Sequence, residues 1–229
     1  MPIFVALASL LFLGVIFGPQ LWVRHVMQRH GDERPDLPGT GAELARHLLD
    51  AAELTAVAVE KTDRGDHYDP EARSVRLLPQ HYDGRSITAV AIAAHEVSHA
   101  VQHAQEEPGF LRRMEAVRAL IWIERIGSAV LVLAPVVFIL VRSPAVVALQ
   151  VCAGISLLAI EVIVHLTTLP VEFDASFGKA LPVLVRGRYL ATGDLPAARS
   201  VLKAAAYTYV AAALATLLNI MRWLRILRL

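Results

Sequence analysis

SITAVAIAAHEVSHAVQH, residues 86–103, is the most informative stretch of the chain. It contains no proline or glycine, so it predicts one helix with Ser86 as the N-cap. Because residues four apart lie on one face of a helix, His95 and His99 can present two imidazole nitrogens to one metal ion. Glu96 points to the side of that face, where a carboxylate can take a proton from zinc-activated water. The pattern predicts a hydrolytic zinc site with Glu96 as general base.

A catalytic zinc usually takes three protein ligands, so a third ligand must come from elsewhere in the chain. Glu172 is the preferred candidate because it begins a second expected helix, 172–186, and would complete a His₂Glu site. Asp174 could orient a zinc-bound histidine. Three histidines are alternatives to Glu172: His67, His103 and His165. Of these, His103 lies on the correct helix face but about 12 Å beyond His95 at 1.5 Å per residue.

Composition points to a membrane protein. Hydrophobic residues make up 55% of the 229 residues and the mean hydropathy is +0.50, both high for a water-soluble chain. The net charge of +1 gives no reason to expect a nucleic-acid partner. The single cysteine, Cys152, excludes an internal disulfide framework.

The pattern of apolar and polar residues predicts a mainly α, integral membrane fold with about four transmembrane helices and a small zincin-like α+β catalytic segment. Apolar runs long enough to span a bilayer occur at 3–23, 121–141, 144–169 and 204–224. The predicted order is an N-terminal membrane anchor (1–23), a catalytic segment (24–118), two transmembrane helices (119–169), a segment with the third metal ligand (170–203), and a C-terminal membrane helix with a basic tail (204–229).

Within the catalytic segment, residues 41–54 predict an amphipathic helix after the linker PDLPGTG. Residues 55–60 and 74–78 predict two short strands, and the turn-forming sequence DRGDHYDPEA between them favours a hairpin. If residues 74–78 form an exposed edge, that strand could bind substrate by strand addition.

Several separated motifs resemble one known family, the small bacterial membrane neutral zinc metallopeptidases of the YugP type. The motifs are DHYDP (66–70), the helix 86–103, TLPVEFDAS (168–176) and TYVAAAL (208–214), and the resemblance covers residues 41–224. It implies a gluzincin-like peptidase with one zinc ion held by His95, His99 and Glu172, and Glu96 as catalytic base. The chain departs from the family pattern at Ser98, where a glycine is usual, and at FGKAL (177–181), which is less basic.

Topology provides a consistency test. Two apolar spans separate the histidines from Glu172, and an even number of crossings returns the chain to the same side of the membrane. Basic residues near the span ends favour a cytoplasmic active site in a bacterial inner or plasma membrane, although the basic tail argues against it.

Polar and ionisable residues inside apolar spans are often functional. Glu124 and Arg125 are candidates for an interfacial position. Glu161 and His165 stand four residues apart and could form a buried pair, and Tyr209 is a candidate hydrogen-bond donor to the oxyanion of the transition state.

The expected function is hydrolysis of peptide bonds in a protein or peptide substrate, including membrane-associated substrates. A zinc-binding membrane scaffold or chaperone-like protein without proteolytic activity is the alternative. A transporter that uses Glu161 and His165 is a third hypothesis, disfavoured by the small number of spans. The substrate and the oligomeric state do not follow from the sequence.

Overall fold

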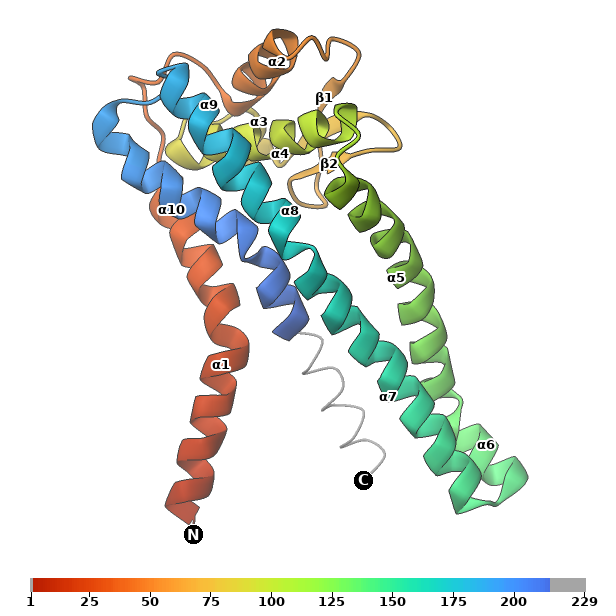
Figure 1. Cartoon of the computed structure of the whole chain (residues 1–229). Helices are drawn as coiled ribbons and strands as arrows, with labels where there is room; N and C mark the ends of the chain where they lie inside the picture. Colours follow the sequence, from red (N-terminus) through yellow and green to blue (C-terminus); the bar gives the residue numbers. More distant parts are fainter. Residues whose placement is uncertain (1, 215–229) are drawn as a thin grey trace. The chain divides into compact units, whose positions relative to one another are not determined.

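The computed structural model of the chain describes residues 2–214 (Figure 1). These residues form two compact units. The first unit contains residues 2–20, 112–169 and 209–214, and the second contains Leu21–Leu111 and Pro170–Thr208. The two parts of the chain that carry His95 and Glu172 therefore belong to the same unit.

The second unit is built around α4 (Ile87–Ala104), nearly all of which is buried. Ser86 caps it by accepting a hydrogen bond from the Ala89 N–H at 3.0 Å, as expected. The helical elements that pack against α4 include α2 (Gly41–Ala51), α3 (Pro79–Tyr82), the π-helical segment η1 (Asp174–Ala180), α9 (Leu181–Arg186) and α10 (Leu195–Ala206) (Figure 1). The predicted helix at 41–54 is confirmed as α2, which starts with a capping box between Thr40 and Glu43.

A three-stranded sheet packs against the same helix. Its strands are β1 (Ala58–Lys61), β2 (His67–Asp69) and β3 (Ser74–Leu77), in the order β1-β3-β2. β1 pairs with β3 in parallel, and β2 pairs with β3 antiparallel.

This topology corrects two predictions. The hairpin joins β2 to β3 and not residues 55–60 to 74–78, because part of the expected turn forms β2 itself. β3 is the central strand, so it offers no free edge for strand addition by a substrate. Val75 and Leu77 lie on the same face of β3, and both are fully buried.

The predicted helix at 172–186 is a continuous helical run with a local change of pitch. α8 (Leu169–Phe173) leads into a π-helical segment, η1 (Asp174–Ala180), which continues as α9. A π-helical turn adds a residue, so the side chains of η1 are rotated relative to Glu172. The expected polar connection after it contains a short 3₁₀ turn, η2 (Thr192–Asp194), and a helix that the sequence did not predict, α10.

Long helices dominate the first unit. α1 (Pro2–Arg29) begins there, followed by α5 (Pro108–Val132), α6 (Ala134–Val141) and α7 (Pro144–Thr167). The run expected at 121–141 is broken between α5 and α6, with a bend of 41°. Pro135 explains the break, since proline disfavours helical backbone before it and donates no hydrogen bond. The Gln150 side chain donates to the Val130 carbonyl at 2.7 Å beside the break.

In the part of the chain that the structure describes, fewer helices are long and apolar enough to cross a membrane than the four that the sequence predicts. Among the described residues, the helical run Pro144–Arg186 is long and apolar enough to cross a membrane, and the bent pair α5–α6 is a second candidate if it counts as one span. Four spans are therefore not confirmed, and the five predicted segment boundaries stay predictions. Residues 215–229 of the predicted C-terminal helix, and the side chains of Glu124 and Glu161, lie outside the described part of the structure.

Candidate metal centre

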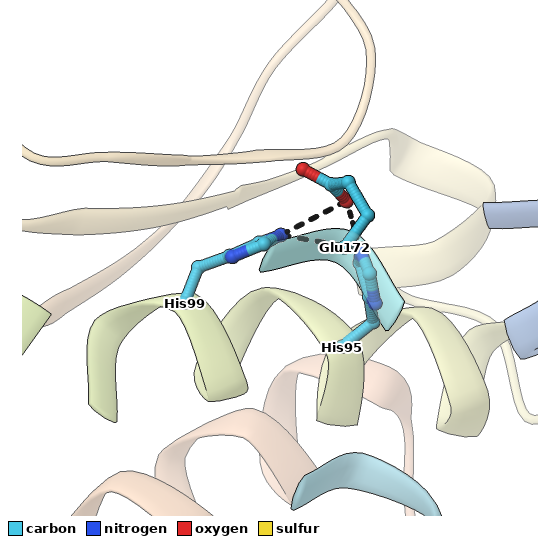
Figure 2. Close-up of side chains that lie close together, drawn as sticks. All are labelled: His95, His99 and Glu172. Carbon is cyan, nitrogen blue, oxygen red and sulfur yellow. Dashed lines mark hydrogen bonds and ion pairs between the residues drawn. The ribbon is translucent and has the colours of Figure 1, made fainter. Parts of the chain in front are cut away.

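Three side chains from two distant parts of the sequence meet in the second unit. His95 and His99 project from α4, and Glu172 reaches them from α8 (Figure 2). All three are buried, with exposed fractions of 3%, 3% and 1%. One atom from each of them can act as ligand to a single metal ion.

The three facing atoms form a nearly equilateral triangle. His95 Nε2 lies 3.2 Å from His99 Nε2 and 3.2 Å from Glu172 Oε2, and His99 Nε2 lies 3.3 Å from the same oxygen. Tetrahedral zinc with bonds of about 2.0–2.1 Å holds its ligand atoms about 3.3–3.4 Å apart. The spacing of the triangle therefore fits zinc coordination.

A hydrogen-bond chain fixes the tautomer of His99. The Gln102 amide nitrogen donates to the Val171 carbonyl at 3.1 Å and to Asp174 Oδ2 at 2.8 Å. Both partners only accept, so the amide oxygen of Gln102 must face His99 Nδ1, which it contacts at 2.8 Å. Because an amide oxygen cannot donate, Nδ1 of His99 carries the proton and Nε2 carries the lone pair.

The same reasoning applies to His95. The Ser176 hydroxyl donates to the Leu202 carbonyl at 3.1 Å, and this uses its only hydrogen. Ser176 Oγ lies 3.0 Å from His95 Nδ1, so it accepts the Nδ1 proton. Nε2 of His95 therefore also presents a lone pair toward Glu172.

The hydrogen bonds behind His99 and His95 leave three electron-pair donors facing one another in a buried space: two imidazole nitrogens and a carboxylate oxygen. Burying an ionised carboxylate costs several kcal/mol unless a cation compensates. A divalent cation satisfies all three groups at once, and two imidazoles with one carboxylate are the donor set of His₂Glu zinc sites. The residues present therefore fit a zinc ion.

A second layer of charged groups holds Gln102 in place. Asp174 accepts from Gln102 and from Lys179 Nζ at 2.5 Å, and Lys179 also pairs with Glu107 at 2.7 Å. Burial raises the pKa of the Asp174 carboxyl, but the hydrogen bonds from Lys179 and Gln102 outweigh burial, so its pKa is lowered and it stays ionised. Asp174 thus acts on His99 through Gln102.

Sequence reasoning missed Gln102, Ser176 and Lys179. Helical spacing could have indicated two of them, since Gln102 follows His99 by three residues and Ser176 follows Glu172 by four. Lys179 belongs to the FGKAL segment, so the departure from the family pattern there lies next to the site.

The alternative third ligands have other partners. His67 Nδ1 lies 2.8 Å from the Gly65 carbonyl, and the His165 ring packs against Tyr209 in the first unit. His103 Nδ1 lies 2.9 Å from the Tyr68 hydroxyl. Burial lowers the pKa of His103, which favours the neutral ring as acceptor of that hydroxyl proton. The triad that can hold a metal contains none of the three.

Glu96 and Ser98 lie on the same helix as the histidines. Glu96 follows His95 directly and is buried, with 7% of its surface exposed. Ser98, where the family pattern has glycine, is also buried, and its hydroxyl donates to the Ala94 carbonyl at 2.7 Å. The serine is therefore accommodated without an unsatisfied hydroxyl.

Comparison with known proteins points to a zinc-dependent family. The model of a family described as "Putative neutral zinc metallopeptidase" matches residues 5–228. The chain belongs to this family. The chain is also 38% identical over 230 residues to "Putative membrane protease YugP" of Bacillus subtilis (strain 168). The alignment covers 98% of the chain and 95% of that relative, whereas no solved structure matches the chain.

Replacing Gln102 with leucine is expected to weaken zinc binding about 10- to 100-fold, because His99 loses the acceptor that orients its ring. Competition with a chromophoric zinc chelator measures the affinity. Gln105→Leu is the matched control, since Gln105 is exposed one turn further along and should leave the affinity unchanged. Equal affinities for the two variants would contradict the role of Gln102.

Replacing Ser176 with alanine should lower zinc affinity about tenfold, because His95 Nδ1–H loses its acceptor and the link to Leu202 is lost. Ser98→Ala is the control, as the Ser98 hydroxyl bonds within its own helix. The same chelator competition compares them. A Ser98→Ala loss as large as that of Ser176→Ala would show that the effect comes from packing alone.

Proposed function

We propose that this protein is a membrane-embedded zinc metalloendopeptidase with one zinc ion, held by His95, His99 and Glu172. The observation that carries the proposal is the triangle of buried electron-pair donors, with both imidazole tautomers fixed by hydrogen bonds behind them. Membership of the metallopeptidase family supports the same chemistry. A metal-binding scaffold would need the triangle but would not need a buried carboxylate at position 96.

When bound, zinc acidifies water and polarises the scissile carbonyl. His95 and His99 keep their Nε2 lone pairs directed inward because Ser176 and Gln102 hold the opposite ring nitrogens. Glu96 accepts a proton from the attacking water and returns it to the departing amine.

The peptidase test combines metal analysis with hydrolysis of an unfolded protein such as casein by the purified full-length chain. Wild type should contain stoichiometric zinc, whereas His95→Ala and Glu172→Ala should lose it. Glu96→Gln should keep zinc but hydrolyse about 10²- to 10⁴-fold more slowly, because it cannot exchange the proton.

Glu106→Gln serves as the matched control, since Glu106 is exposed in the turn after α4 and should not affect hydrolysis. Stoichiometric zinc in Glu172→Ala would remove the third ligand. Wild-type hydrolysis by Glu96→Gln would remove the general base. A zinc-loaded wild type that cleaves nothing would leave the scaffold as the better function.

We also propose that the second unit faces the cytoplasm, because basic residues concentrate in the segments that form it. A cysteine placed at the exposed Ala72, in a variant where Cys152 is alanine, reports the side. An impermeant maleimide should label it in opened membrane vesicles and not in intact bacterial spheroplasts. Labelling in intact spheroplasts would reverse the orientation.

A further inference from the structure

The second unit carries a cluster of aromatic rings that the metal centre does not use. Neighbouring rings contact one another in sequence: Trp22 lies 6.1 Å from Tyr207, Tyr207 lies 5.5 Å from Phe173, and Phe173 lies 5.7 Å from Phe177. Trp22 and Phe173 are 37% and 36% exposed. The cluster therefore forms a continuous apolar surface that water reaches.

Two cations from α10 lie over these rings. Arg199 is 5.8 Å from the centre of the Phe177 ring, and Lys203 lies 6.0 Å from Trp22 and 5.9 Å from Tyr207. Both cations are exposed, and within residues 2–214 neither forms an ion pair with a carboxylate. The aromatic–cationic patch, composed of these four rings and two cations, carries two positive charges without local compensation.

The patch occupies the points where the chain passes into the first unit. Trp22 follows Gln20, the last residue of the first segment of that unit, by two residues. Phe173 comes four residues after Leu169, and Tyr207 precedes Tyr209 by two. Each of three positions at which the chain crosses between the two units therefore contributes one ring to the patch.

Aromatic residues and cations at the ends of membrane helices have a known physical preference. Tyrosine and tryptophan are enriched at the level of lipid headgroups, where one part of the ring is apolar and the other is hydrated. Lysine and arginine near the membrane surface attract anionic lipids. A water-soluble partner would explain the rings but not their position at three chain passages.

We propose that the aromatic–cationic patch binds the phosphate headgroups of anionic lipids, with Arg199 and Lys203 as the phosphate ligands and Trp22 inserted at headgroup depth. The proposal rests on the membrane location in the proposed function and is independent of peptidase activity. η1 and α10, which bear Phe177 and the two cations of the patch, also supply Ser176 and the Leu202 carbonyl behind His95. The bilayer surface is thereby coupled to the two helices that position a proposed ligand.

Trp22 fluorescence provides the test. The full-length chain with Trp122→Phe and Trp223→Phe retains Trp22 as its single tryptophan, and it is reconstituted in nanodiscs with equal amounts of phosphatidylcholine and phosphatidylglycerol. Two samples are compared: in one the phosphatidylglycerol is brominated near the headgroup end of its acyl chains, and in the other the phosphatidylcholine is brominated at the same position. Brominated phosphatidylglycerol should quench Trp22 about threefold more strongly than brominated phosphatidylcholine, because the cations enrich anionic lipid.

Adding Arg199→Gln and Lys203→Gln should bring the quenching ratio to about one. The matched control is Arg186→Gln with Arg188→Gln, which removes the same charge from exposed positions outside the patch and should keep the preference. Equal quenching by both lipids in the parent protein, or weak quenching by both, would overturn the proposal. So would a preference that survives the Arg199 and Lys203 substitutions. None of these readings depends on zinc or hydrolysis, so the peptidase proposal can fail separately.

Discussion

The convergence of two imidazole lone pairs and one carboxylate in a buried space is the constraint on which the rest of the structure depends. Three such groups repel one another, so holding them about 3.2–3.3 Å apart requires support from behind and a cation in front. Support comes from Gln102 and Ser176, and each of them is anchored on a backbone carbonyl. The backbone of the second unit therefore defines the direction of both histidine rings.

The elements around α4 follow from this constraint. α4 has to be buried on nearly all sides, because one face carries His95 and His99 toward Glu172 and the others pack against α2, the sheet and α10. With the π-helical turn of η1, one continuous helical run delivers Glu172 to the Nε2 atoms of both histidines, Asp174 to Gln102, and Ser176 to the opposite ring nitrogen of His95. A regular α-helix would place Glu172 and Ser176 on the same face, one turn apart, with Asp174 turned away from them.

Much of the site was accessible from the sequence because its information is local. The spacing of His95 and His99 is a property of any α-helix, and Ser86 is a recognisable N-cap. Glu172 was selected by ligand chemistry and by resemblance to the family, and the structure places it beside both histidines. The number of membrane spans was less accessible, since Pro135 interrupts an apolar run whose composition alone predicts one helix.

The sequence by itself determined the helix with its two histidines, the amphipathic α2 and the abundance of apolar helices, because each depends on a short repeating pattern. Only the tertiary structure decided which strands pair, which carbonyls anchor Gln102 and Ser176, and which rings gather around Arg199 and Lys203. These contacts join residues far apart in the chain, and strand order in particular depends on how β2 and β3 pack on α4 and how β1 packs on α2. A local pattern cannot encode such choices, because many pairings satisfy it equally until the whole chain has to fill one core.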